Sequence, residues 1–409
     1  MIPFFPTPYP DELWYGLVTR FHLHSGFEFW SDSLRLLFPN HQHPHVGSLL
    51  PNETMRRLVQ RLPEGILGLE ELVLRHSLFS FRLLFLEREK KIKYLQQYLQ
   101  GEDIQPKLLS LTKKQREHPL RYCPICARED AEGFGETYWH TEHQIWIMPL
   151  CPIHGCRLVE ASCRTTMSLS RQLVLIPDQL PVPDMRADNT EQKLTALLHQ
   201  WYKMPLEASP SIGATDNLGR AMENAGLLAP GNVRRLAWDT GRLYRALTDR
   251  FGAEVITEVF GRNMTTAHAR RLRLGGIACT EEYALLSILL GVGADVLFCQ
   301  DQIPLTIQQK MLELSCAGRP FTKKNVAELL GIRVDQVMPY AERFGIEPFW
   351  VQSGKRKTKD ERQTYAVTIH LTPEERHSLD AYMAKHHMDA YGHALRYFMQ
   401  RALCDQSTP

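Results

Sequence analysis

Two short cysteine motifs constrain the fold of this chain more than any other feature. The segment CPIC places two residues between Cys123 and Cys126, and the segment CPIH places two residues between Cys151 and His154. Each pair forms a tight turn that directs both side chains to one point, and two such pairs complete the tetrahedron that zinc prefers. Residues 127–150 leave room for a small hairpin between them. We therefore predict a structural Cys₃His site with zinc as cofactor, the alternative being chance clustering of the two pairs.

Residues near this site could bind a second metal ion. Four further residues of ligand type occur nearby: His140, His143, Cys156 and Cys163. Plain surface histidines and small buried thiols are the alternative. A zinc-dependent hydrolase would need an exchangeable metal position and a general base, for which Glu136 and Glu142 are nominal candidates. Four protein ligands leave no exchangeable position, so we expect a structural site.

Bulk properties exclude several classes of protein. The chain has 409 residues, 44% of them hydrophobic, which is enough for about two to four domains. A net charge of +2 gives no global positive field, so any nucleic-acid surface must be local. No apolar run reaches the about 18 residues of a membrane span, and the start lacks the regions of a signal peptide. Nine unevenly spread cysteines favour metal binding over disulfides. We expect a cytoplasmic protein with no membrane partner.

Apolar residues at helical spacing predict a mainly α, multi-domain protein. Leu13, Leu17 and Phe21 recur in a helix expected from about Pro10 until Gly26 ends it. Further helices are expected near residues 29–38, as two or three over 53–100, at 190–202, over 236–298 and over 304–350.

Five parts follow from this pattern. They are an N-terminal helical domain over 1–117, a zinc-ribbon-like module over 118–165, a linker and helix over 166–235, a helical domain of helix-turn-helix type over 236–352 and a ribbon-helix-helix-like module over 364–404.

Three sequence blocks occur in order within the first 165 residues. The first is FFPTPYPDELWYGLVTRFHLHSG (residues 4–26), the second is RHSLFSFRLLFL (residues 75–86), and the third is the Cys/His segment with an internal WH pair. In this order they resemble the TniQ/TnsD family, the target-selecting proteins of certain DNA transposons. Gly16 stands where that family often has Ser. The chain looks shorter than the long site-specific members, so the resemblance is not extended to its C-terminal half.

This resemblance implies a non-enzymatic function. Such proteins recognise a target and recruit an AAA+ transposition regulator, which brings the transposase; the N-terminal region is implied to face the regulator. We assign that contact to four residues: Phe4, Phe5, Tyr9 and Glu12. Some members read DNA themselves, whereas others dock on a CRISPR effector complex whose guide RNA chooses the site. The implied setting is bacterial and nucleoid-associated. The sequence lacks GxxxxGK[ST], GxSxG and HExxH motifs, which agrees with a protein that is not an enzyme.

Residues 321–346 fit the spacing of a helix-turn-helix. Ala327, Gly331 and Val337 take the small, turn and aliphatic positions, while Thr322 and Asp335 are expected to cap the two helices. Three side chains would then point toward a DNA groove: Arg333, Gln336 and Tyr340. The alternative is a helical hairpin that does not bind DNA.

Residues 364–404 resemble a ribbon-helix-helix module. Val367, Ile369 and Leu371 alternate with polar residues as in a strand, and TPEE at residues 372–375 forms a capping box with Pro at the first helical position. Leu379 and Met383 fall on one face of that helix. A single strand would leave unpaired edges, so we expect a homodimer.

Two groups in this region are candidates for DNA contact. Thr368 and His370 face outward from the strand, and a cationic run that could neutralise phosphates precedes it: Lys355, Arg356, Lys357 and Lys359. A solvated linker and a purely dimerising module are the alternatives. These C-terminal motifs alone also fit a zinc-containing transcriptional repressor, whereas the N-terminal blocks favour the target selector.

Overall fold

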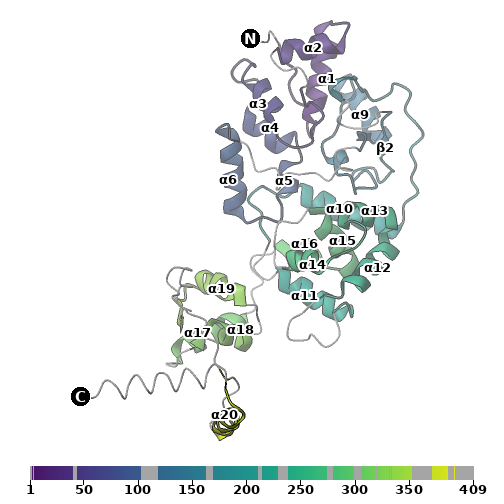
Figure 1. The fold of residues 1–409 in the computed structure, drawn as a ribbon. Coiled ribbons are helices and arrows are strands. Elements are labelled where there is room, and N and C mark those ends of the chain that lie inside the picture. Colours follow the sequence, from purple (N-terminus) through teal and green to yellow (C-terminus); the bar gives the residue numbers. More distant parts are fainter. Residues whose placement is uncertain are drawn as a thin grey trace. The chain divides into compact units, whose positions relative to one another are not determined.

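The computed structural model describes residues 2, 4–39, 44–102, 118–162, 169–210, 214–228, 238–273, 280–298, 305–317, 321–330, 332, 334–351, 371–385 and 391. The chain divides into two compact units, Met1–Trp350 and Val351–Pro409. Helices account for most of the first unit (Figure 1), which confirms the mainly α fold class. None of the helices in the described part of the chain combines the length and apolar character that crossing a membrane requires.

The N-terminal region is a cluster of short helices around a buried first helix. Its helices are α1 (Trp14–Ser25), α2 (Trp30–Leu37), α3 (Glu53–Val59), α4 (Leu69–Arg75), α5 (Phe79–Arg82) and α6 (Arg88–Leu99). Trp14, Leu17 and Phe21 of α1 are at most 1% exposed, because helices on several sides cover this element. The predicted two or three helices over residues 53–100 are four, since Ser77 interrupts the run: its Oγ accepts the N–H of Phe79 at 3.2 Å.

Helix α1 begins later than predicted and ends where predicted. Gly26 adopts φ 73°, the left-handed conformation that terminates helices and that glycine tolerates best. The start is displaced from Pro10 to Trp14 because Asp11 has φ 57° and Glu12 forms a β-bridge with His140. The residues before α1 therefore pair with a distant segment instead of extending the helix.

The zinc module consists of β1 (Arg121–Tyr122), α9 (Pro124–Phe134), the 3₁₀ turn η1 (Glu142–Gln144) and β2 (Val159–Glu160). The strands are antiparallel, with Arg121 opposite Glu160. A helix replaces the hairpin expected between the two ligand pairs. Pro124 at the first helical turn favours this helix, and Gly135 ends it at φ 81°.

A helical bundle follows the zinc module. It comprises α10 (Asn189–Tyr202), α11 (Ala214–Asn224), α12 (Thr240–Phe251), α13 (Ala253–Phe260), α14 (Thr266–Arg273), α15 (Thr280–Leu290) and α16 (Ala294–Phe298). The predicted helix over residues 190–202 is confirmed as α10, which starts with a capping box between Asp188 and Glu191. One hydrophobic cluster extends from Ile2 to Leu297 and includes residues of the N-terminal helices, the zinc module and this bundle. The predicted domain boundaries stay a prediction.

A second cluster is built by α17 (Leu305–Cys316), β3 (Phe321–Thr322), α18 (Lys323–Leu330), the 3₁₀ turn η3 (Val334–Gln336), α19 (Val337–Phe344) and β4 (Trp350–Val351). Thr322 caps α18 as predicted, its Oγ1 accepting the N–H of Asn325 at 3.2 Å. The predicted cap of the second helix is wrong, because Asp335 lies inside η3 and Gln336 is the residue before α19.

The second unit contains α20 (Pro373–Lys385). The predicted capping box is confirmed: the N–H of Glu375 donates to Thr372 Oγ1 at 3.3 Å, and the N–H of Thr372 donates to Glu375 Oε2 at 2.8 Å. Leu379 and Met383 are both buried, as expected for one apolar face. The predicted strand before this helix includes Val367 and Ile369, which lie outside the described residues.

Candidate metal centre

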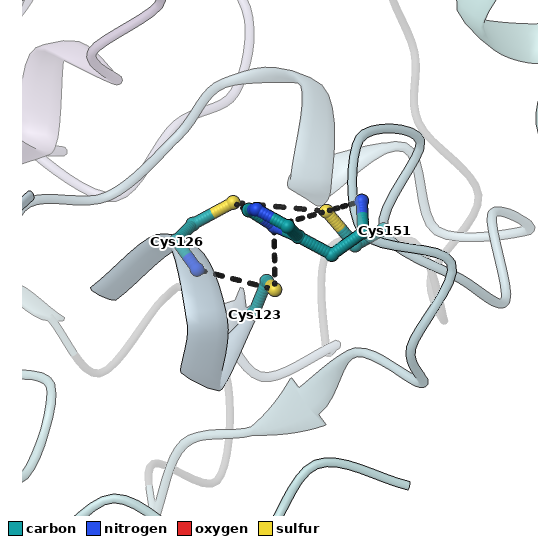
Figure 2. Close-up of side chains that lie close together, drawn as sticks. Cys123, Cys126 and Cys151 are labelled. Carbon is teal, nitrogen blue, oxygen red and sulfur yellow. Dashed lines mark hydrogen bonds between the residues drawn. The ribbon is translucent and has the colours of Figure 1, made fainter. Parts of the chain in front are cut away.

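The four predicted zinc ligands converge on one point. Cys123, Cys126, Cys151 and His154 place one donor atom each within 4.8 Å of all the others, and Figure 2 shows the three cysteine side chains directed toward one another. His154 Nδ1 lies 3.5, 3.2 and 3.6 Å from the three sulfur atoms in chain order, and the sulfurs of Cys126 and Cys151 are 3.6 Å apart.

These separations suit zinc. Zinc–sulfur bonds of about 2.3 Å and zinc–nitrogen bonds of about 2.0–2.1 Å at tetrahedral angles place sulfurs about 3.8 Å apart and sulfur and nitrogen about 3.6 Å apart. The donor set is a soft, closed Cys₃His combination, which is typical of structural zinc and leaves no position for an exchangeable water. The residues present therefore fit the ion that the sequence predicts.

The two knuckles are built alike by their backbones. The N–H of Cys126 donates to Cys123 Sγ at 3.4 Å, and the N–H of His154 donates to Cys151 Sγ at the same distance. Cys123 is also the N-cap of α9, so its sulfur accepts a helix-start N–H while facing the site. Gly155 at φ 67° then reverses the chain after His154.

Two histidines at the site make further contacts. His154 Nε2 pairs with Glu129 Oε2 at 3.1 Å, which keeps Nδ1 directed at the sulfurs, as carboxylates commonly do for metal-bound histidines. His143 is buried and its Nε2 lies 4.0 Å from Cys126 Sγ. Burial lowers the pKa of His143 to about 3, so the ring is neutral and its Nε2–H can face a thiolate.

The other ligand-type residues do not build a second metal cluster within the described part of the chain. Cys163 lies outside that part. Cys156 is fully buried, and its sulfur is 3.3 Å from Cys123 Sγ. The expectation of surface histidines is wrong for His140 and His143: His143 is buried beside Cys126, and the largely buried His140 side chain faces Asp11 of the N-terminal segment.

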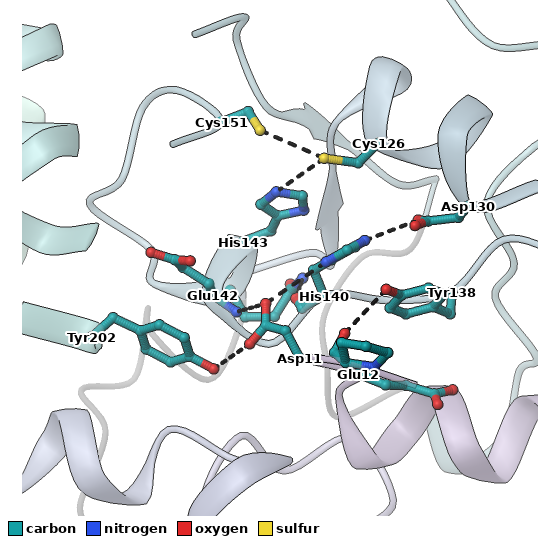
Figure 3. Close-up of polar contacts among 12 residues, drawn as sticks. Asp11, Glu12, Cys126, Asp130, Tyr138, His140, Glu142, His143, Cys151 and Tyr202 are labelled. Atoms are coloured by element: carbon teal, nitrogen blue, oxygen red, sulfur yellow. Dashed lines mark hydrogen bonds and ion pairs between the residues drawn. The ribbon is translucent and has the colours of Figure 1, made fainter. Parts of the chain in front are cut away.

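His140 carries a positive charge between two carboxylates (Figure 3). Its Nε2 pairs with Asp130 at 2.9 Å and its Nδ1 lies 3.7 Å from Asp11. Burial alone would lower the pKa of His140, but hydrogen bonds and charge from Asp11 and Asp130 outweigh it and raise the pKa to about 9. The imidazolium therefore links α9 to the segment before α1.

Asp11 is the centre of this link. Its carbonyl oxygen accepts the N–H of Thr141 at 2.7 Å, and its carboxylate accepts the N–H of Glu142 at 3.3 Å and the hydroxyl of Tyr202 (Figure 3). Burial would raise the pKa of Asp11, but hydrogen bonds from His140 and Tyr202 keep it below its usual value. The N-terminal segment, the zinc module and α10 thus meet at one carboxylate.

Two of the four residues predicted to bind a partner are buried. Glu12 is 0% exposed and pairs with Arg20 at 2.8 Å, and burial raises its pKa to about 7. Phe5 is 6% exposed and stacks on Phe21. Both residues stabilise the fold, because the segment before α1 packs inward. Phe4 is exposed, and Tyr9 is half-buried over the Arg20 guanidinium at 3.6 Å.

Gly16 fits the space beside Glu12. A Cβ at this position would lie 2.9 Å from Glu12 Oε1 and 3.0 Å from its Cγ. The serine that the family often carries would therefore require Glu12 to move. In this chain Glu12 Oε1 is one of the buried oxygens without a hydrogen-bond partner among the described atoms.

The predicted DNA-contacting residues are not gathered into a surface. Gln336 and Tyr340 are 5% and 3% exposed, which corrects the expectation that they face a groove. They are buried because Val337, Tyr340 and Ala341 form the stripe of α19 that packs on the second cluster. The remaining candidates lie outside the described residues: Arg333, Lys355, Arg356, Lys357, Lys359, Thr368 and His370.

The sequence interpretation missed an exposed apolar group near the C-terminal end of α1. Four large side chains there are between 37% and 59% exposed: Phe4, Leu23, Phe27 and Phe29. We call them the α1-end apolar group. The signal in the sequence was two aromatic residues directly after the helix-ending Gly26, where loops usually carry polar side chains.

Comparison with known proteins agrees with this geometry. Residues 3–158 match the model of the TniQ family, and this range covers the N-terminal segment, α1–α6 and all four zinc ligands. This part of the chain is therefore similar to a TniQ domain. Its sequence is also similar to the transposon Tn7 transposition protein TnsD of Escherichia coli, with 24% identity over 155 residues. That match covers 37% of this chain and 30% of the relative, so the chain matches less than a third of the relative's length.

Proposed function

We propose that this protein selects the target site in DNA transposition and recruits an AAA+ transposition regulator to it. The observation that carries the proposal is the TniQ match over residues 3–158. The relative named as a Tn7 transposition protein supports the same process. Recruitment by binding, without chemistry, is consistent with the closed Cys₃His donor set.

The two carboxylates nominated as general bases, Glu136 and Glu142, support a non-enzymatic role. Glu136 pairs with Arg20 at 2.9 Å and with His24 at 2.9 Å. Glu142 is buried and accepts from His199 at 2.7 Å. A general base needs access to a water on the metal, and both candidates are instead engaged in ion pairs. A zinc hydrolase is therefore disfavoured.

The α1-end apolar group is the surface that we assign to the regulator. Phe29 is 59% exposed and Leu23 is 49% exposed. Exposed large apolar side chains that follow one another closely along the chain are candidates for a protein-binding surface. Phe4 belongs to the contact predicted from the sequence, whereas the buried Phe5 and Glu12 act indirectly by holding Phe4 and α1 in place. Aromatic anchors of this kind contribute most of the affinity of many interfaces.

A binding experiment with the regulator from the same transposon tests this assignment. The double variant Phe27→Ser/Phe29→Ser should weaken binding of the purified regulator in the presence of ATP by at least about 2 kcal/mol, on the order of 30-fold in Kd. The control is Val182→Ser/Met185→Ser, which removes two exposed apolar side chains from the segment before α10. Equal affinities for both variants and the unmodified protein would refute the assignment.

The target-facing side is assigned to the C-terminal part of the chain. The cationic run with Lys355, Arg356, Lys357 and Lys359 supports phosphate contact. Thr368 and His370 are the candidate DNA contacts on the strand through which the chain is expected to form a homodimer. Gel-shift binding to the transposon's attachment sequence, without RNA, tests direct reading. Binding only together with a guide-RNA effector complex would assign the alternative, docking on a CRISPR complex. Tight operator-like binding without any affinity for the regulator would instead assign a zinc-containing repressor.

A further inference from the structure

Within the described residues, the zinc module contains one thiol more than its metal site uses. Cys156 is 0% exposed, and its Sγ lies 3.3 Å from Sγ of the ligand Cys123. Its carbonyl oxygen accepts the N–H of Cys151 at 2.7 Å, and the bridge between Leu150 and Arg157 flanks this bond. The backbone therefore holds the sulfur of Cys156 beside the site without placing it among the four converging donors.

We propose that Cys156 is a resolving thiol, which forms a disulfide with Cys123 when the module meets a peroxide. The site is thus a reversible oxidation site as well as a metal centre. This inference concerns the thiols of the zinc module alone, and it stands or falls independently of the function proposed above.

The chemistry balances with hydrogen peroxide as the oxidant. The Cys123 thiolate attacks one peroxide oxygen, forms Cys123–SOH and, with one proton, releases water. The Cys156 thiol then attacks the sulfenic sulfur, so the S–O bond breaks, the S–S bond forms and a second water leaves. In sum, two thiols lose two electrons and two protons, and one peroxide becomes two waters.

Distance and bonding favour Cys156 over the other thiols as the second partner. A disulfide needs its sulfurs about 2.0 Å apart, so Cys123 and Cys156 must approach by about 1.3 Å from their 3.3 Å separation. Cys126 and Cys151 are 3.6 Å apart, and each is a ligand that must first leave the metal. Cys156 is not a ligand, so it attacks without that cost.

The knuckle around His154 is the route by which a small oxidant reaches the buried sulfurs. Ile153 at its tip is 69% exposed, and the His154 side chain is partly exposed beside the largely exposed Glu129. A fluctuation of this one turn exposes the sulfur atoms behind it. Oxidation would remove Cys123 from the donor set, leaving at most three of the four ligands.

Disulfide mapping of the zinc-loaded full-length protein tests the proposal. The protein is treated with a limiting amount of hydrogen peroxide, free thiols are blocked, and tryptic peptides are analysed by mass spectrometry. Trypsin leaves Cys123 with Cys126 on one peptide and Cys151 with Cys156 on another, but backbone cleavage before Pro124 and Pro152 separates the members of each pair. Cys316, an exposed thiol, reports that the blocking reagent was in excess.

The expected result is a predominant Cys123–Cys156 disulfide that a thiol reductant reverses, together with release of zinc detected by a chromogenic chelator. The variant Cys156→Ala should contain zinc like the unmodified protein before oxidation and should lose the reversible cross-link. A predominant disulfide among Cys123, Cys126 and Cys151, or a Cys156 that stays free while zinc is released, would overturn the proposal. If Cys156→Ala does not fold, the map of the unmodified protein decides alone.

Discussion

The motif of residues 4–26 and the motif of α18 and α19 both bury polar residues, but those residues contact different parts of the molecule. Asp11 and Glu12 lie in the most recognisable stretch of the sequence. Asp11 contacts His140 and Glu12 pairs with Arg20, so both carboxylates make contacts inside the protein. Gln336 and Tyr340 belong to a weaker motif and are likewise buried, but they pack within a small cluster of their own. A recognisable motif can thus mark a residue that assembles the fold, and the binding surface must be sought among its exposed neighbours.

Of the changes in the N-terminal region, removing a zinc ligand should reduce stability most. We expect Cys151→Ser to lose zinc and to unfold the module, because structural zinc contributes on the order of 10 kcal/mol of binding free energy that is also folding free energy. Zinc content and hydrogen exchange of α9 measure this. Cys316→Ser is the control, because that thiol is exposed and outside the site. Unchanged zinc in Cys151→Ser would show that the four donors do not form the centre.

Breaking the link at Asp11 should come next. Asp11→Ala leaves the hydroxyl of Tyr202 and the N–H of Glu142 without their acceptor, and it removes one of the two carboxylates beside His140. We expect a loss of about 3–5 kcal/mol in the free energy of unfolding, typical of a broken buried ion pair, while zinc stays bound. Denaturant unfolding measures it. Asp184→Ala serves as the control, since that carboxylate pairs with the exposed Arg186 at the surface. Equal losses in the two variants would mean that the segment before α1 is not anchored by its carboxylate.

The charge on His140 makes the same link depend on pH. Its pKa is about 9 in the fold and about 6.5 in an unfolded chain, so the folded state binds the proton more tightly. The resulting stability, up to about 3 kcal/mol, is fully present below pH 6.5 and is lost as pH rises through 9. Unfolding free energies of the unmodified protein and of His140→Gln are measured between pH 6 and 10. Other groups, such as Lys91 with its pKa lowered to about 8, titrate in both proteins, so the difference between the two curves isolates the contribution of His140 and should shrink by the stated amount as pH rises. Parallel curves would contradict the assignment of this charge.

The smallest effect is expected for a variant of α19, on the affinity for DNA. Because Tyr340 is buried, Tyr340→Phe should leave DNA affinity unchanged within about 0.5 kcal/mol. Lys355→Ala should instead weaken binding and reduce the salt dependence by about one phosphate contact. Fluorescence anisotropy at several salt concentrations separates the two. A larger loss in Tyr340→Phe than in Lys355→Ala would restore the groove-facing interpretation of α19.

The sequence predicted those features that depend on near neighbours. The ligand set follows from the spacing of Cys123, Cys126, Cys151 and His154; the end of α1 follows from Gly26; and the start of α20 follows from its capping box. Each is decided within a few residues along the chain.

The features that escaped prediction depend on residues far apart in sequence. Glu12 and Phe5 are buried because the segment before α1 pairs with residues 139–142, which no local pattern reveals. The left-handed Asp11 follows from the same pairing. The burial of Tyr340 is a different case. Val337, Tyr340 and Ala341 recur at helical spacing, so that stripe was visible in the sequence and was outweighed by the helix-turn-helix pattern.

One sulfur atom joins the metal centre to the segment that opens the chain. Cys123 caps α9, whose Asp130 holds His140 and whose Phe134 packs 4.3 Å from the ring of Tyr9. We expect an empty site to unwind the first turn of α9 and to weaken the contacts of that helix with the opening residues of the chain. We therefore expect loss of the ion to loosen the N-terminal segment, although the ion touches no residue of that segment.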